Sequence, residues 1–438
     1  MAENAKATAA KTLFNAIELD KLIGQMANKC LRHGQANSSS SMMHGDLPAG
    51  LTAKSSWCLF VLQALATKGS LVAEIGVGIV GGGYMGKAHA VAMAAVARVF
   101  DTTLRPSLEV ICTTTEAGAA EKARQFGFKR STSDWRKLVD DPAVQAVVIA
   151  SPQEFHHDIA IAAFACGKHV LCEKPLGQNL AQSRAMLQAA EASVSIHMVG
   201  FNYIRTPASQ LARQIIARGE IGDITFLRAE HTEDFLSDAA LPGDWRTQGR
   251  PNGNMGDLAP HIVNAALALA GPITALVADI ATVHQSRGGM AVTNDDQSSI
   301  MCRFANGAMG HLFVSRIATG RKMGYAYEIY GTKGSIRFDQ EDQNALWLYR
   351  AWGAEDRRGY TKILTGPLHP DYKPFCMGPG HGTGYQDQII IEAKDFLQSI
   401  HEGKPRWPTF RDGMLVNQII EAGWRSHEGR CWINLADV

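Results

Sequence analysis

Charge of one sign is missing from this sequence. Lysine and arginine total 43 and aspartate and glutamate total 42, which gives a formal net charge of +1 at pH 7. A chain without excess charge has no overall field to attract a polyanion or an anionic lipid surface. We therefore predict no nucleic-acid partner and no membrane partner.

Long hydrophobic runs are equally scarce. The longest near the N-terminus, residues 57–66, is too short to span a bilayer and contains Gln63. The first residues also lack the basic and then apolar pattern of a secretory signal. With 46% hydrophobic and 19% charged residues, the composition is that of a globular protein. These features predict a cytoplasmic protein.

Paired cysteines are absent as well. The eight cysteines are scattered, and no two stand in a C-x-x-C arrangement. This favours reduced thiols over disulfides or a zinc site. The adjacent His156 and His157 would point to different sides of an extended turn, which is a poor geometry for two ligands of one ion. We predict no metal at these residues, nor at the pairs Asp257/His261 and His369/His381.

The chain is long enough for two or three domains. Between 76 and 201, strand-like and helical segments alternate, which predicts an α/β domain with a doubly wound parallel sheet. Between 202 and 438, longer alternating strands joined by tight turns predict a second α/β domain with a large open, mainly antiparallel sheet. Closing helices at 386–402 and 412–427 are placed to pack back on the first domain. Residues 1–75 form an extension of undecided structure, with candidate helices at 5–26 and 56–67.

A glycine motif opens the first α/β domain. The apolar run 75–80 leads into Gly81, Gly83 and Gly86, spaced as G-x-G-x-x-G, and an alanine-rich segment follows. The order strand, turn, helix is that of a dinucleotide site, where the glycines permit a tight turn, close approach of a pyrophosphate and close helix packing. The motif therefore predicts a bound dinucleotide at this turn, which also contains Tyr84 and Met85.

The end of the second strand bears on the choice between NAD and NADP. Such folds usually place a carboxylate there for the ribose diol, but this strand ends at Thr113. A hydroxyl repels a 2′-phosphate less than a carboxylate does. No arginine follows directly to bind that phosphate, although Lys122 and Arg124 lie on the next helix. The cofactor preference stays open between NAD and NADP.

Several ordered segments resemble the Gfo/Idh/MocA family of NAD(P)-dependent oxidoreductases. They are the glycine turn at 78–89, Ser-Pro-Gln-Glu-Phe-His at 151–156, the Glu-Lys-Pro segment within 167–176, Gly-Phe-Asn-Tyr at 200–203, the D-x-x-x-H at 257–261 and Tyr-Gly-Thr-Lys-Gly at 330–334. The resemblance implies a Rossmann domain, then a domain whose open sheet assembles a homodimer or homotetramer. It also implies oxidation of a hydroxyl of a sugar, polyol or cyclitol, or the reverse reduction. Cofactor contacts would include Ser151, Pro152, His156, Glu173 and Lys174.

The same family pattern maps the chemistry onto three residues. Lys174 would hydrogen-bond the reacting oxygen beside the nicotinamide. His261 would be the general acid/base, since imidazole titrates near neutral pH. Asp257 stands four residues earlier, on the same face of a helix, where it would orient the ring and touch the substrate. Ala259-Pro260 replaces the family's common Gly-Ser between them.

Candidate substrate contacts follow the predicted strand that ends at 201. Ligands bind at the carboxyl ends of parallel strands, which points to Asn202, Tyr203 and Arg205. Trp245 and Arg246 precede the D-x-x-x-H segment and suit stacking and hydrogen bonding to a sugar ring, although Trp245 suits core packing equally well. The loop 364–384, rich in glycine and proline, contains His381 and would close over the pocket.

Two other functions fit the same motifs. One is an NAD-dependent glycosidase that works through transient oxidation, although such relatives tend to carry a twin-arginine signal, which is not seen here. The other is a non-catalytic sensor that binds cofactor and sugar. Retention of Lys174, Asp257 and His261 argues against a sensor.

Overall fold

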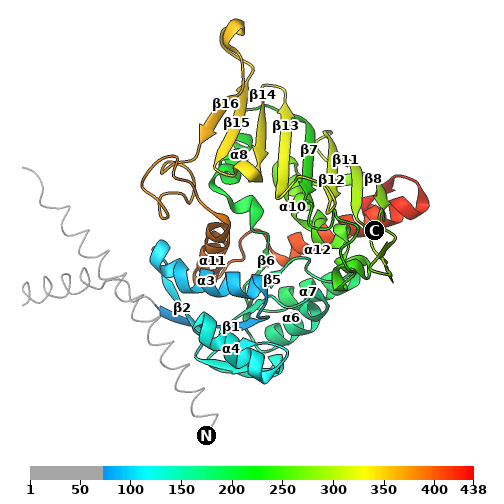
Figure 1. Ribbon diagram of the computed structural model, residues 1–438. Helices are drawn as coiled ribbons and strands as arrows, with labels where there is room; N and C mark the ends of the chain where they lie inside the picture. Colours follow the sequence, from blue (N-terminus) through cyan, green and yellow to red (C-terminus); the bar gives the residue numbers. More distant parts are fainter. Residues whose placement is uncertain (1–72) are drawn as a thin grey trace, which may run out of the picture. The chain divides into compact units, whose positions relative to one another are not determined.

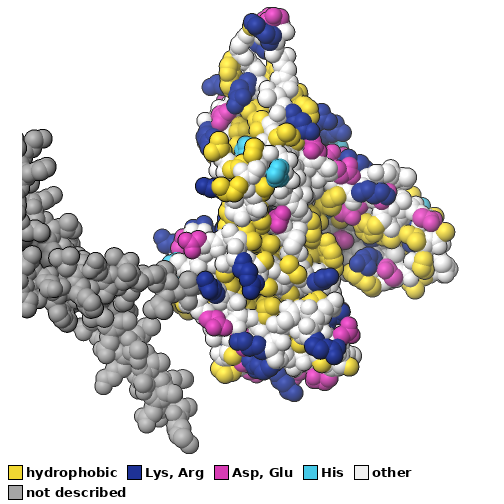
Figure 2. All heavy atoms as spheres, turned by 60° about the vertical axis from the view of Figure 1, so that its left-hand side comes forward, with side chains coloured by type: hydrophobic (Ala, Val, Ile, Leu, Met, Phe, Trp, Pro, Cys, Tyr) yellow, Lys and Arg dark blue, Asp and Glu magenta, His cyan; other side chains and the backbone are white. Residues whose placement is uncertain are grey.

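The computed structural model describes residues 73–438, all within one compact unit (Figure 1). The candidate helices at 5–26 and 56–67 lie outside the described residues. Within 73–438, no helix combines the length and apolar character that a bilayer crossing needs. Figure 2 shows basic and acidic side chains interspersed over the face in view, with apolar side chains between them. That face therefore gathers no field of a single sign.

The first sheet has six strands, all paired in parallel, in the order β3-β2-β1-β4-β5-β6. The strands are β1 (Ala73–Val80), β2 (Leu104–Cys112), β3 (Arg130–Thr132), β4 (Ala146–Ile149), β5 (His169–Glu173) and β6 (His197–Gly200). The connecting helices are α3 (Tyr84–Val99), α4 (Glu116–Phe126), α5 (Trp135–Asp140), α6 (His156–Ala165) and α7 (Leu180–Glu191). The predicted doubly wound sheet is confirmed, and the strand order reverses between β1 and β4, where such folds bind their ligands.

The second sheet has nine strands in the order β16-β15-β14-β13-β7-β12-β11-β8-β17. They are β7 (Ile224–Thr232), β8 (Ile273–Ala281), β11 (Gln297–Phe304), β12 (Met309–Ser315), β13 (Gly324–Gly331), β14 (Gly334–Asp339), β15 (Ala345–Arg350), β16 (Thr361–Leu364) and β17 (Ile433–Asn434). All pairs are antiparallel except β7 with β12. The mainly antiparallel prediction is therefore confirmed. A two-stranded ribbon, β9 (Ser286–Arg287) with β10 (Met290–Ala291), lies apart from this sheet.

Helices cover one face of the large sheet (Figure 1). They are α8 (Pro207–Ala217), α9 (Asn254–Asp257), α10 (Ala259–Ala270) and α12 (Phe410–Gly429). On the other face Met301, Met309 and Tyr330 are exposed. One hydrophobic core runs from the inner face of this sheet into the first sheet, with Val147 and Leu312 both among its members.

The last two long helices, α11 (Tyr385–Glu402) and α12, both pack against elements of the first domain. Helix α11 packs against α3. Its residues Ile389 and Phe396 belong to the same core cluster as Val77 of β1 and Met93 of α3. Helix α12 packs against both α7 and β8. The parallel sheet is thus covered on one side by a helix that comes late in the chain.

Candidate active site

The glycine turn at the end of β1 has the geometry of an anion site. Gly81 has a φ of +114°, and a Cβ there would collide with the carbonyl oxygen of Ala150. A Cβ on Gly86 would collide with the carbonyl of Gly81, so helix and turn touch. Around Gly83, by contrast, a Cβ would meet nothing within 4 Å. Because α3 starts here without a capping side chain, its first N–H groups are free to bind a phosphate.

Two side chains flank this turn on the side of the second strand. A Cβ on Gly82 would lie 2.7 Å from Cγ2 of Thr113 and 3.1 Å from Cγ of Lys122. The Thr113 hydroxyl donates to the carbonyl of Thr115 at 3.2 Å. A threonine at this position offers no carboxylate to a ribose. The turn, the open space at Gly83 and these neighbours fit a dinucleotide across the switch point of the sheet.

His156 joins the loops that follow β4 and β5. Its Nδ1 lies 3.0 Å from the carbonyl oxygen of Pro175, and its Nε2 lies 3.1 Å from that of Ser151. Burial lowers the pKa of His156. The histidine therefore fixes the Ser151-Pro152 loop against the loop that carries Lys174.

The turn also meets the C-terminal helix α11. The hydroxyl of Tyr385 donates to the sulfur of Met85 at 3.3 Å. The exposed ring of Tyr84 stacks on Tyr385 with centroids 5.7 Å apart. Tyr385 in turn lies 6.2 Å from the ring of Tyr203, which gives a continuous aromatic wall from the turn towards His261.

Lys174 and Asp257 are in direct contact. The Lys174 ammonium donates to Oδ1 of Asp257 at 2.8 Å and to the backbone carbonyl of Asp257 at 2.9 Å. The lysine follows β5 and the aspartate ends α9, so the contact joins the two sheets' elements. Burial would raise the pKa of Asp257, but Lys174, His231 and Arg246 together outweigh burial and hold that pKa below its usual value. The Asp257 side chain remains 44% exposed, which leaves it accessible to a substrate.

His261 lies on the first turn of α10 beside the ring of Tyr203, with centroids 4.4 Å apart. Its side chain is buried and its Nδ1 has no hydrogen-bond partner within the described chain. Burial lowers the pKa of His261 well below its ordinary value, and the charge interactions with Lys174 and His231 act in the same direction. The lowered pKa favours a neutral imidazole, and its Nδ1 is enclosed by the protein.

Other candidate substrate residues are engaged elsewhere. The Asn202 amide donates to Gln388 of α11 at 3.2 Å, and the buried Arg205 forms ion pairs with Glu392 and Asp395. His381 is exposed, and its Nδ1 lies 3.3 Å from the sulfur of Cys376 in the same loop. No contact within residues 73–438 brings these three side chains to Lys174.

Trp245 and Arg246 lie together on the 3-10 helix Trp245–Thr247. The guanidinium carbon of Arg246 lies 4.3 Å from the centre of the Trp245 ring, whose residue is 59% exposed. Burial acts to raise the pKa of Asp257, and the positive charge of Arg246 helps to lower it, with a smaller effect than Lys174 and His231. The exposed ring of Trp245 and the guanidinium of Arg246 thus lie near the Lys174–Asp257 pair.

Sequence reasoning missed His231 of β7, whose ring lies 5.4 Å from that of His261. No motif marks it. The available signal was the alternation of β7, in which Leu227, Ala229 and His231 face the interior. That period predicts an inward histidine on the strand beside α10, but not its neighbours.

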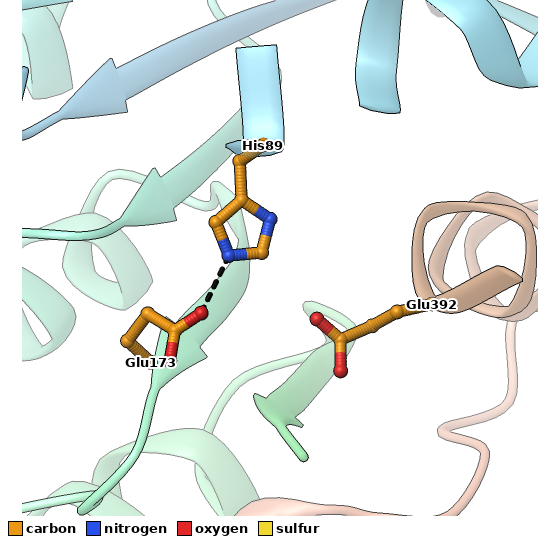
Figure 3. A group of neighbouring side chains, drawn as sticks. All are labelled: His89, Glu173 and Glu392. Atoms are coloured by element: carbon orange, nitrogen blue, oxygen red, sulfur yellow. Dashed lines mark hydrogen bonds and ion pairs between the residues drawn. The ribbon is translucent and has the colours of Figure 1, made fainter. Parts of the chain in front are cut away.

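A group of three buried side chains has ligand atoms within 4.8 Å of one another (Figure 3). Nε2 of His89 lies 2.7 Å from a carboxylate oxygen of Glu173, and Glu392 of α11 faces this pair. Neither Glu392 oxygen has a hydrogen bond, but Nε of Arg205 lies 3.4 Å away. The guanidinium already supplies the positive charge that the carboxylates need, so we assign no metal ion to this group.

Comparison with family models matches most of the described chain. Residues 75–201 match an oxidoreductase family with an NAD-binding Rossmann fold, and residues 209–337 match a GFO/IDH/MocA C-terminal domain. These two ranges cover the glycine turn, the Glu-Lys-Pro loop and the Asp257/His261 segment.

Characterised relatives and solved structures align along nearly their whole length. Levoglucosan dehydrogenase of Pseudarthrobacter phenanthrenivorans is 39% identical over 386 residues, which are 83% of this chain and 99% of that protein. Myo-inositol 2-dehydrogenase of Thermotoga maritima is 26% identical, with 83% and 99% covered. A structure of levoglucosan dehydrogenase in complex with NADH and levoglucosan superposes with a TM-score of 0.81 at 40% identity, again covering 83% and 99%.

Proposed function

Because the chain belongs to the GFO/IDH/MocA family of nicotinamide-dependent oxidoreductases, we propose that it oxidises a secondary hydroxyl of a sugar, with an anhydrosugar such as levoglucosan as the first candidate. As a family member the protein is an NAD(P)-dependent enzyme that acts on CH–OH groups. The observation that carries the proposal is the contact of Lys174 with Asp257 beside the imidazole of His261. The 39% identity to levoglucosan dehydrogenase supports the choice of sugar, and inositols are the next candidates.

The proposed roles follow from charge and position. When bound, the cofactor's nicotinamide supplies the hydride acceptor. The free N–H groups at the start of α3 would hold the pyrophosphate of the cofactor. Lys174 donates a hydrogen bond to the reacting oxygen and stabilises its developing negative charge. His261 takes the hydroxyl proton on its imidazole ring, so the substrate loses a hydride and a proton in total.

Asp257 holds the ammonium of Lys174 in place and offers its exposed carboxylate to a second sugar hydroxyl. We propose that Trp245 stacks on the apolar face of the ring and that Arg246 hydrogen-bonds its edge. We propose that the ring of Tyr203, which lies against His261, borders the sugar. Asn202 and Arg205 are bonded to α11 and would support the backbone beside Tyr203. His381, exposed in the loop 364–384, stays a proposed sugar contact.

Cofactor choice and assembly complete the proposal. Thr113 carries no charge to repel a 2′-phosphate and Lys122 stands beside it, so we propose that the enzyme accepts NAD and tolerates NADP. We propose that residues 76–201 form the cofactor domain and residues 202–438 form the substrate domain. We further propose a homodimer or homotetramer formed through the exposed face of the nine-stranded sheet, where Met301, Met309 and Tyr330 lie.

The test is a substrate screen with the full chain. Levoglucosan, 1,5-anhydroglucitol, glucose and myo-inositol are each mixed with NAD or NADP, and reduced nicotinamide is followed by its absorbance. Steady reduction with an anhydrosugar supports the proposal. Release of phenol from an aryl glycoside without net reduction of cofactor would instead identify a glycosidase. Binding of cofactor and sugar without turnover of either kind would identify a sensor.

A further inference from the structure

His231 is a second buried histidine beside the proposed catalytic pair. It lies near the end of β7, and its ring is 5.4 Å from that of His261 and 5.6 Å from that of Tyr203. The roles proposed above leave it unused. His231 is thus a buried titratable ring in contact with both His261 and Tyr203.

The hydrogen-bond partners of His231 favour a ring that carries a proton on both nitrogens. Its Nδ1 lies 3.1 Å from the backbone carbonyl oxygen of Leu258, and its Nε2 lies 3.1 Å from a carboxylate oxygen of Glu233. A carbonyl and a carboxylate can only accept, whereas a neutral imidazole carries a single N–H. The Glu233 side chain is 20% exposed, so water solvates its charged form. An imidazolium satisfies both contacts at once and pairs its charge with the carboxylate.

His156 provides the contrast within the same molecule. Its two ring nitrogens also face acceptors, but both are backbone carbonyls, and burial lowers its pKa. His231 differs because one partner is a carboxylate, which stabilises a positive ring through both charge and hydrogen bond.

The Leu258 carbonyl connects His231 to His261. Besides the bond from His231, this oxygen accepts from the backbone N–H of His261 at 3.2 Å. Leu258 is the N-cap residue of α10. His231 therefore holds the backbone at the point where the first turn of α10 sets the position of the His261 ring.

We propose that His231 is a positioning residue of the hydride-transfer site: held as an imidazolium by Glu233 and the Leu258 carbonyl, it fixes the start of α10 and disfavours a second positive charge on His261. The inference rests on the proposed role of His261 as a proton acceptor. It assigns to Glu233 the task of holding the charge on His231.

Charged and titratable groups from every neighbouring element face these two rings. They are Lys174 after β5, Tyr203 after β6, Asp257 at the end of α9, Tyr325 of β13 and Glu233 after β7. The negative charge of Asp257 and the positive charge of Lys174 are of opposite sign and form a direct ion pair. Burial, Lys174 and His231 then act in one direction, and all three keep His261 neutral.

The first test reads protonation directly and does not depend on turnover. The full-length protein is labelled with ¹⁵N-histidine, and the ring resonances of His231 are assigned by their loss in His231→Gln. We expect both ring nitrogens of His231 to be protonated at pH 7. A neutral His231 ring in the folded protein would overturn the proposal, whether or not a substrate has been found.

The second test follows the pKa of His261 in variants. His231→Gln keeps an N–H that can donate to Leu258 but removes the charge, and Glu233→Gln removes the carboxylate that holds it. In both, the NMR titration of His261 should move to higher pH by roughly one unit. His401→Gln is the control, because His401 is exposed in the last turn of α11, away from both rings.

The same shift should appear in the pH profile of kcat/KM for the sugar, whose acidic limb should move upward in both variants. A fall in kcat with an unmoved limb and an unmoved His261 titration would make His231 merely structural and sink the proposal. If the wild-type protein turns over no sugar, the proposed function fails, while the two NMR readouts still decide the present inference.

Discussion

Lys174 and Asp257 are 83 positions apart in the chain, yet the ammonium nitrogen of one lies 2.8 Å from a carboxylate oxygen of the other. The pair joins the loop after β5 to the helix that precedes α10. Moving the Lys174 ammonium into solvent would break its ion pair with Asp257, so the pair restrains the ammonium in this position. The pair is therefore preorganised for a reacting oxygen, which is where electrostatic catalysis gains most.

Replacing the lysine tests that conclusion. Lys174→Ala should lower kcat by at least ~100-fold, as for loss of an oxyanion-type donor, while NADH still binds, since the glycine turn is untouched. Turnover and NADH fluorescence titration are the measurements. Lys404→Ala, at an exposed site after α11, is the matched control. Near-normal turnover in Lys174→Ala would remove Lys174 from the reaction.

Two glycines of the turn should fail in different ways. Gly83→Ala adds a methyl group where the fold has open space, so we expect an unchanged Tm and an NAD affinity about tenfold weaker or worse, because the methyl occupies the path of the pyrophosphate. Gly86→Ala forces a methyl against the Gly81 carbonyl and should cost about 1–3 kcal/mol of stability. Calorimetry with and without NAD separates the two. Equal Tm losses would contradict this assignment.

Cofactor preference should respond to Thr113. Thr113→Asp places a carboxylate beside Lys122 and the turn, where it repels the 2′-phosphate of NADP. The Kd for NADP should rise by roughly tenfold or more, and the Kd for NAD should stay the same or fall. Thr114→Asp, one exposed residue further on, controls for added charge. An equal change for both cofactors would place the ribose elsewhere.

Glu392 should make stability depend on pH. Burial raises the pKa of this carboxyl to about 7, against the lowering effect of Arg205 and His89. The folded state therefore keeps a proton that the unfolded chain has lost above its own lower pKa, and wild-type stability falls as pH rises through this window.

Glu392→Gln removes that penalty. Relative to wild type, its free energy of unfolding should improve by about 1–3 kcal/mol between roughly pH 5 and pH 8. Denaturant unfolding at each pH gives the difference. Glu402→Gln, an exposed residue of the same helix paired with Arg406, should show no such gain. A difference that is flat with pH would mean that Glu392 is charged throughout.

The proposed assembly depends on the exposed face of the large sheet. Met301→Glu on β11 should place charges against charges across a two-fold interface and lower the mass seen by light scattering. Val194→Glu changes a fully exposed residue of the other domain and should leave the mass unaltered. An unchanged mass in Met301→Glu would move the interface to another surface.

Much of the backbone could be read from local pattern. The sequence 116–126 followed by Gly127 predicts a helix that ends at this glycine, and α4 ends there, with Gly127 at a φ of +84°. Alternating residues at 297–304 and 334–339 predict strands, and β11 and β14 stand at these positions. These elements were predictable because periodicity and turn residues are encoded within a few neighbouring positions.

The misses have a common cause. Strand β3, Arg130–Thr132, has only three residues, too few for an alternation to register. Arg205 stands at the end of a strand as substrate residues do, but its guanidinium is occupied by Glu392 and Asp395, which come far later in the chain. His231 likewise acquires its meaning from Glu233 and Leu258 together. Pairings between distant segments leave no local trace.

The contact of α11 with α3 has a consequence for how the protein is made. During synthesis the whole parallel sheet leaves the ribosome long before Ile389 and Phe396, which complete its core beside Val77 and Met93. Until then that side of the nascent domain must remain uncovered, a state that chaperones recognise. A fragment that ends after the cofactor domain would therefore expose this apolar face and aggregate. A chain that includes α11 buries it.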